Sequence, residues 1–206
     1  MPRLREVGRA DAHPAALAMY DFLFGDRDPV ADPGTSTGSP GDWWTVTALV
    51  PDAFDHILGG IGFYRSPDRI ISPHLRELGQ LRVGYITMSR FVWSQHCKAC
   101  REMGWSDEKI QAARAWQTSD LFEPVERALL AYTDALVLEG GRVDEQLMDA
   151  LKAHLSEEEI LEFTYITLTY DMYARMSKAL MLEFDNVDDD IREIDGGQLG
   201  DGRATS

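Results

Sequence analysis

Hydrophobic residues recur along most of this chain at the three- and four-residue spacing of amphipathic helices. The pattern predicts helices over residues 13–24, 42–50, 52–64, 73–87, 90–103, 106–116, 124–138, 144–155 and 156–182. No stretch sustains the alternation of hydrophobic and polar residues that is typical of a half-buried strand. We therefore expect an all-α fold.

Capping residues mark several of these boundaries. Ser72 and Pro73 are suited to the N-cap and the first position of one helix. Ser89 is a good N-cap for the next helix. Ser156 and Glu159 have the spacing of a capping box, in which each side chain accepts a hydrogen bond from the other residue's backbone.

The pattern divides the chain into three segments. Residues 1–40 hold one helix and then a stretch rich in Pro, Gly, Ser and Thr, which we expect to be a mobile loop. Residues 41–182 form the helical domain, in which L75-R-E-L-G-Q-L and I160-L-E-F-T-Y-I suggest two related helical halves. Residues 183–206 carry eight acidic side chains and two arginines, and are predicted to be an acidic tail.

Composition excludes some classes of partner. The 206 residues carry a formal net charge of −15, which disfavours nucleic acids and anionic membrane surfaces. No apolar run reaches the roughly 18 residues of a membrane-spanning helix. The N-terminus lacks the apolar stretch of a signal peptide, and two cysteines do not indicate a disulfide scaffold. We expect a cytoplasmic protein whose partner is a small molecule.

Candidate chemistry gathers in residues 77–104, which hold a carboxylate, an imidazole and two thiols. Glu77 precedes His96 by nineteen residues, so on one straight helix they would stand about 28 Å apart. They can share a site only if the chain turns back between them or if a second chain supplies one of them. Gly79 and Gly84 weaken the first helix, which favours a turn before Ser89.

His96 is predicted to face inward, because it shares an apolar stripe with Val92, Ala99, Cys100 and Met103. A histidine in this setting is either a core residue or a general acid and base. Glu77 could orient and activate that imidazole. The alternative is a solvated glutamate or one paired with Arg76, Arg82 or Arg101.

Cys97 and Cys100 form a C-x2-C pair in the interior of the predicted helix. Redox pairs of this kind profit from a helix N-terminus, which lowers the pKa of the first thiol. Core thiols are therefore the alternative to a redox dithiol. A zinc site with His96 would need a fourth ligand that the neighbourhood does not offer, so we expect no metal.

Four further residues are candidates for substrate binding. Arg82 and Arg175 could hold a substrate carboxylate, because guanidinium groups pair with carboxylates through two hydrogen bonds. Tyr85 and Trp93 could line the same pocket.

The segment 93–110, W-S-Q-H-C-K-A-C-R-E-M-G-W-S-D-E-K-I, resembles the carboxymuconolactone decarboxylase and alkylhydroperoxidase-like (AhpD-like) superfamily. The matching positions are Trp93, His96, Gly104, Ser106, Glu108 and Ile110. Val92 replaces the tract's glutamate, and Cys100 occupies an alanine position. The peroxidase pattern E-x11-C-x2-C-x3-H falls on Glu77, Ser89, Val92 and His96, so its carboxylate and imidazole are present and its two cysteines are not.

The resemblance extends over about residues 41–182, because residues 126–134, 155–163 and 170–175 are also similar to longer members. It implies a helical bundle that associates as a dimer, trimer or hexamer, which suits a last helix that is apolar on most sides. It also implies acid–base chemistry on a small organic acid or lactone, with no cofactor. The alternatives are a thiol peroxidase using Cys97 and Cys100, and a ligand-binding oligomer without catalysis.

Overall fold

The computed structural model describes residues 1–182, whose regular secondary structure is entirely helical and includes no strand. The helices are α1 (Pro14–Phe24), α2 (Asp42–Thr47), α3 (Pro51–Arg65), α4 (Pro73–Ile86), α5 (Arg90–Glu102), α6 (Asp107–Ala112), α7 (Pro124–Val137), α8 (Glu145–Lys152) and α9 (Glu157–Leu180), with short 3-10 turns η1 (Arg9–Asp11) and η2 (Ala113–Thr118). The all-α prediction is confirmed. The predicted acidic tail, residues 183–206, lies outside the described residues.

The boundaries follow the capping residues. The side chains of Ser72 and Ser89 accept the backbone N–H of the third residue of α4 and α5, respectively. Ser156 and Glu159 form the expected capping box at α9. One prediction was wrong: the helix expected over residues 106–116 breaks into α6 and η2, with non-helical backbone at Ala115.

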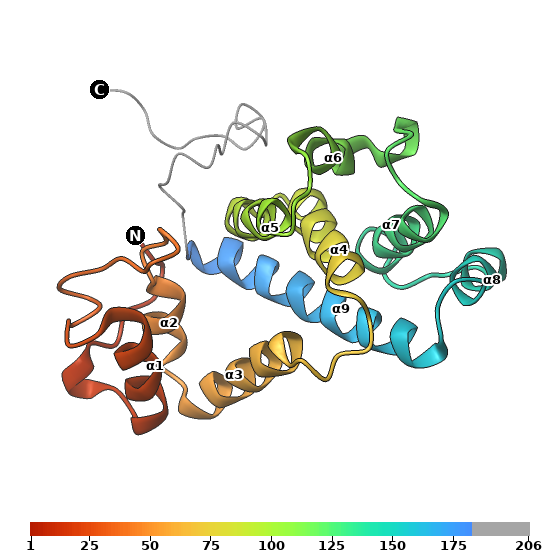
Figure 1. The fold of residues 1–206 in the computed structure, drawn as a ribbon. Coiled ribbons are helices and arrows are strands. Elements are labelled where there is room, and N and C mark those ends of the chain that lie inside the picture. The colour runs from red at the N-terminus through yellow and green to blue at the C-terminus, as the bar shows by residue number, and fades with distance from the viewer. Residues whose placement is uncertain (183–206) are drawn as a thin grey trace.

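Helix α4 lies at the centre of the arrangement. It packs against α5, α7 and α9, while α9 extends below them and also contacts α3 and α8 (Figure 1). Figure 1 places α1 and α2 at one end of α9 and α8 at the other. Consequently, α4 is covered on several sides, and eight consecutive residues of it, 77–84, are buried.

Two hydrophobic clusters share α4. One joins α4, α7, α8 and α9 through fully buried side chains such as Val83, Leu151 and Phe163. The other joins α4 to α5, α6 and α7 through Leu81 and Trp93 among others. The polar residues of α4 are therefore enclosed by apolar packing on both sides, which fixes the helix in place.

The segment 25–41 contains no helix, as its composition predicted, but hydrogen bonds close it on itself. Gly34 N–H donates to the Pro40 carbonyl and Thr35 N–H to the Ser39 carbonyl, both at 2.9 Å. Just before it, Phe24 packs in a cluster that includes Phe54 of α3. The N-terminal helix thus packs directly against the helical domain.

Gly79 and Gly84 do not break α4, which runs through both. They instead allow close approach. A Cβ at Gly79 would lie 2.7 Å from the Phe163 ring of α9. A Cβ at Gly84 would lie 2.6 Å from the backbone nitrogen of Trp93 in α5. The predicted hairpin is present, but the glycines serve helix packing and not the turn.

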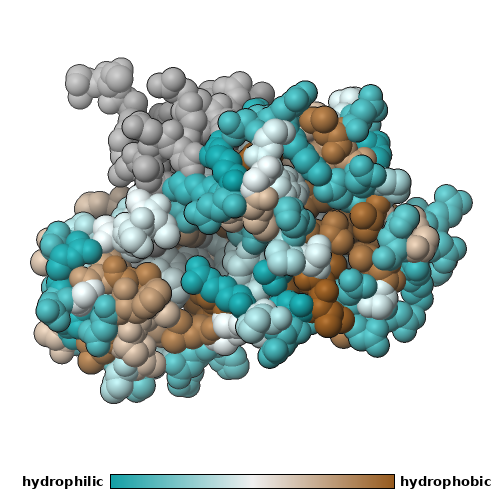
Figure 2. Space-filling model, viewed as in Figure 1, coloured by the Kyte–Doolittle hydropathy of each residue, from teal (hydrophilic) through white to brown (hydrophobic). Residues whose placement is uncertain are grey.

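Hydrophilic residues cover much of the visible face, with hydrophobic patches between them (Figure 2). On α9, four apolar side chains are exposed at positions i, i+4, i+7 and i+11: Leu161, Tyr165, Leu168 and Met172. This spacing places them along one stripe of the helix.

We predict that Gly84→Ala destabilises the protein by about 1–3 kcal/mol, because the added methyl meets the α5 backbone, which cannot move aside like a flexible side chain. The matched control is Gly62→Ala in α3, where nothing lies within 4 Å of the added Cβ. That change should stabilise by about 0.5–1 kcal/mol, since alanine loses less entropy in a helix. Urea unfolding of both variants measures the difference, and an undiminished stability of Gly84→Ala would contradict the close-approach account.

Candidate active site

The connection between α4 and α5 brings Glu77 and His96 together within one chain. The chain reverses over residues 87–89, where Met88 takes a positive φ of 57° and Ser89 N–H donates to the Gly84 carbonyl at 2.9 Å. Glu77 lies ten residues before Thr87 and His96 seven after Ser89, so both stand about two to three helical turns from the reversal. A second chain is not needed to complete the pair.

Glu77 and His96 form a buried hydrogen-bonded pair. Glu77 Oε2 lies 2.6 Å from His96 Nδ1, and the two side chains are only 6–7% exposed. An ionised carboxylate only accepts hydrogen bonds, so Nδ1 carries the proton of this contact. Within residues 1–182, Nε2 of His96 has no hydrogen-bond partner, which leaves it as the ring atom able to accept or deliver a proton.

Two tyrosines enclose the imidazole. The Tyr170 ring of α9 lies 4.8 Å from the His96 ring, and the Tyr64 ring of α3 lies 6.3 Å from it, both edge to face. Burial, together with the negative charge of Glu77, raises the pKa of the Tyr170 phenol. Tyr170 therefore remains a neutral hydrogen-bond donor at physiological pH.

Arg76 is a neighbour of this group that the sequence suggested only as a partner for Glu77. Its guanidinium lies 4.8 Å from the centre of the Tyr64 ring. Burial lowers the pKa of Arg76, while Tyr170 and Glu162 act in the opposite direction. The positions of Tyr64 and Tyr170 beside His96 did not follow from helical periodicity, because these tyrosines belong to α3 and α9, which are far from α5 in the sequence.

Cys97 and Cys100 are free thiols buried in the interior of α5. Both are fully buried in an apolar cluster with Leu78 and Trp93. Burial, with a smaller effect of the Glu77 charge, raises the pKa of Cys100, which opposes formation of its thiolate. The residue at the N-cap, where a reactive thiol would benefit from the helix, is Ser89. These observations favour the core-thiol interpretation for Cys100.

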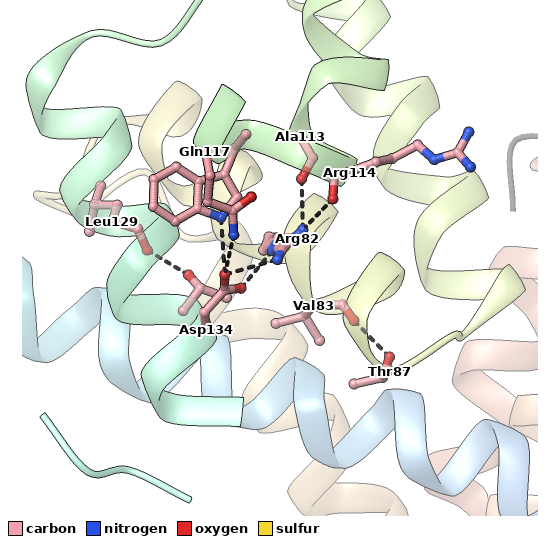
Figure 3. A network of polar contacts seen from close by, with 10 residues as sticks. Arg82, Val83, Thr87, Ala113, Arg114, Gln117, Leu129 and Asp134 are labelled. Carbon is pink, nitrogen blue, oxygen red and sulfur yellow. Dashed lines mark hydrogen bonds and ion pairs between the residues drawn. The ribbon is translucent and has the colours of Figure 1, made fainter. Parts of the chain in front are cut away.

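Arg82 is not free to bind a substrate carboxylate, which corrects the prediction for this residue. It lies five positions after Glu77, about 140° around the helix. Its Nε and Nη2 donate to the two oxygens of Asp134 at 2.6 and 2.8 Å, and Nη1 donates to the carbonyls of Ala113 and Arg114 at 2.9 Å (Figure 3). Arg82 thereby ties α4 to α7 and η2.

The other predicted binding residues lie apart from the pair. Tyr85 packs against Trp93 at 5.7 Å, and Trp93 is 1% exposed within the apolar cluster. Arg175 is exposed and pairs with Asp171 at 2.8 Å. Among the described residues, neither Tyr85 nor Arg175 makes a hydrogen bond, ion pair or ring contact with Glu77 or His96.

Two surface hollows lie elsewhere. One is bounded by α3 and Tyr165 of α9, and the other by the end of α4, the end of α7 and Arg175. Neither hollow is lined by Glu77 or His96. The candidate site is therefore defined by the short, buried contact between these two titratable side chains. Residues 1–182 contain no group of three or more His, Cys, Asp or Glu side chains that could hold a metal ion.

Comparison with known proteins agrees with this fold and this segment. The carboxymuconolactone decarboxylase family model matches residues 48–135, which include both Glu77 and His96. The chain is 26% identical over 142 residues to the uncharacterized protein YnjA of Escherichia coli (strain K12), covering 69% of this chain and 76% of YnjA. It is 27% identical over 106 residues to the uncharacterized protein YdfG of Bacillus subtilis (strain 168), covering 51% of this chain and 72% of YdfG.

Solved structures are similar over most of the chain. An alkylhydroperoxidase AhpD core protein, a peroxidase-related protein from Ralstonia eutropha JMP134, has a TM-score of 0.69 at 15% identity, covering 88% of this chain and 91% of its own. A variant of the debrominase Bmp8, in complex with 2,3,4-tribromopyrrole, has a TM-score of 0.66 at 18% identity. This match covers 90% of this chain and 95% of the Bmp8 chain. Residues 48–135 are thus similar to the carboxymuconolactone decarboxylase family, and the chain shares the helical fold of the AhpD-like structures.

No helix within residues 1–182 is long and apolar enough to cross a membrane.

We predict that Arg82→Gln destabilises the protein by about 3–5 kcal/mol, because it removes a buried guanidinium and leaves the partly buried Asp134 carboxylate without its charged partner. Arg175→Gln removes an exposed partner and should cost at most about 1 kcal/mol. Chemical denaturation measures both changes. Equal stabilities of the two variants would mean that the Arg82–Asp134 pair does not hold α4 to α7.

Proposed function

We propose that this protein is an enzyme that performs acid–base chemistry on a small carboxylic acid or lactone, with His96 as the proton-transfer residue. The observation that carries the proposal is the buried 2.6 Å contact between Glu77 and His96. A carboxylate bound to Nδ1 fixes the imidazole tautomer and raises the basicity of Nε2. Similarity to the carboxymuconolactone decarboxylase family over residues 48–135, and to solved structures that include a debrominase, supports a catalytic role.

Decarboxylation of a carboxy-lactone is the reaction proposed for this pair. The bond between the carboxylate and its carbon breaks and releases CO2, and the electron pair moves into the conjugated lactone carbonyl. Protonated His96 then delivers its Nε2 proton to carbon, which consumes one proton for each CO2 released. Glu77 stabilises the imidazolium before the proton leaves. The step moves no electrons to or from an external redox partner.

The alternative, a thiol peroxidase, has less support from the geometry. Cys97 and Cys100 are buried within α5, and burial opposes ionisation of Cys100. The positions that correspond to the family dithiol are Ser89 and Val92. A peroxide would therefore meet no exposed thiolate in the described part of the chain.

We predict that His96→Gln and Glu77→Gln each lower the rate of CO2 release from an active carboxy-lactone by about 10²–10⁴-fold, the usual contribution of a positioned proton-transfer group. A panel of lactones and carboxylic acids identifies the substrate with the wild-type protein, and CO2 release measures the rates. Both glutamine substitutions keep a polar side chain of similar size, and circular dichroism confirms folding.

Cys97→Ala/Cys100→Ala is the matched control and should retain the wild-type rate. The same proteins are assayed with tert-butyl hydroperoxide and a dithiol. Peroxide turnover that disappears in the cysteine variant, with no turnover of any lactone or acid, would replace the acid–base proposal with the thiol peroxidase.

We also propose a small anionic substrate, a cytoplasmic location and a homo-oligomer. The exposed apolar stripe of α9, Leu161, Tyr165, Leu168 and Met172, supports association, because a self-associating subunit would cover such a stripe. Light scattering after size-exclusion chromatography should give a multiple of the 23.2 kDa subunit. Leu168→Asp should reduce that mass, because it places a charge in the stripe. A wild-type mass of one subunit would end the oligomer proposal.

A further inference from the structure

Arg76 makes no ion pair with an acidic side chain within residues 1–182. Its guanidinium makes no hydrogen bond or ion pair there, and its Nε is buried without a partner. A buried donor left unsatisfied costs about 1–3 kcal/mol, and more when it is charged. Such a group is suited to a partner that arrives from outside.

The nearest candidate carboxylate is already engaged. Glu162 of α9 pairs with Arg69 at 2.9 Å and accepts the backbone N–H groups of Ile70 and Ile71 at 2.9 and 3.1 Å. Arg69 thus has an ion-pair partner in Glu162, although its Nε also lacks a hydrogen bond, whereas Arg76 has no ion-pair partner in the described chain. The two arginines therefore differ in function: Arg69 fixes the segment before α4, and Arg76 keeps its donors free.

Tyr170 provides a second donor on the same side of the site. Its ring lies 4.8 Å from that of His96, and its hydroxyl makes no hydrogen bond within the described chain. Tyr64 joins the two donors, because its ring lies 4.8 Å from the Arg76 guanidinium and 5.1 Å from the Tyr170 ring.

We propose that Arg76 and Tyr170 bind a planar oxygen anion, a carboxylate or an enolate on a flat conjugated body, beside His96. Arg76 supplies the charge and Tyr170 a neutral O–H donor, which together suit the two oxygens or the delocalised oxygen of such an anion. Tyr64, Tyr170 and His96 contact one another, so a flat body bound beside His96 would meet aromatic side chains. The carboxylate of Glu77, so close to His96, disfavours a second negative charge on the ligand.

This inference deepens the proposed function and rests on it only for the reaction that would follow binding. In the proposed decarboxylation, negative charge develops on the lactone carbonyl oxygen as CO2 leaves. Arg76 and Tyr170 would hold that oxygen, while His96 delivers the proton on the same side. Donors arranged before the reaction stabilise developing charge without reorganisation.

Binding of a stable carboxylate tests the site without any turnover. Benzoate is the probe and benzamide its neutral counterpart, with affinities measured by titration calorimetry. We expect wild type to bind benzoate and not benzamide, Arg76→Gln to weaken benzoate binding at least about tenfold, and Tyr170→Phe to weaken it about three- to tenfold. Arg142→Gln, an exposed arginine between α7 and α8, should bind as wild type does.

The position of the ligand is tested by NMR of the 15N-labelled imidazole of His96, assigned with His96→Gln. Benzoate should shift this signal in wild type and in Arg142→Gln, and not in Arg76→Gln at the same concentration. Arg76→Lys keeps the charge and should show intermediate affinity, and an unchanged unfolding midpoint shows that each variant is folded.

Either of two results would overturn the inference: no benzoate binding at millimolar concentration by wild type, or equal binding by Arg76→Gln. Failure of the proposed function gives a different result. Benzoate would then bind through Arg76 and shift His96, while no acid or lactone is converted. If a substrate is converted in a His96-dependent reaction but benzoate binds equally well without Arg76, the proposed function stands and the anion site is rejected.

Discussion

The close packing of α4 against α5 at Gly84 is the constraint on which the rest of this structure depends. At this point a glycine of one helix faces the backbone of Trp93 in the other, with no room for a Cβ. The approach allows two short side chains, a glutamate and a histidine, to meet further along the hairpin at 2.6 Å. A wider separation of the helices would leave a buried carboxylate without its partner, which costs several kcal/mol.

Three further helices hold this hairpin in position. Arg82 ties α4 to α7 through Asp134, so the arginine serves architecture. From the other side α3 and α9 bring Tyr64 and Tyr170 to the imidazole. The polar centre is therefore surrounded by aromatic rings and apolar helices, where charge interactions are stronger than in water. The same burial that fixes the pair suppresses ionisation of the thiol of Cys100.

The arginines show how far a sequence interpretation can reach. Arg82 and Arg76 lie six positions apart on one helix and are indistinguishable by residue type. Arg82 was expected to bind substrate, yet its partner Asp134 lies 52 residues away. Arg76 was one of three arginines considered as a partner for Glu77, yet it lies over Tyr64 and has no ion-pair partner in the described chain. Which arginine is compensated depends on contacts between helices, which local spacing does not encode.

The sequence by itself determined the all-α class, most helix boundaries and the pairing of Glu77 with His96 as a hypothesis. Those features depend on local rules: helical periodicity, capping side chains such as Ser89, and a nineteen-residue interval across one hairpin. Only the tertiary structure decided that the pair forms within one chain, that Cys97 and Cys100 are buried, and that Tyr170 and Arg76 join the site. These outcomes depend on the packing of α3, α4, α5 and α9 in three dimensions, and side chains that meet across such packing share no sequence interval.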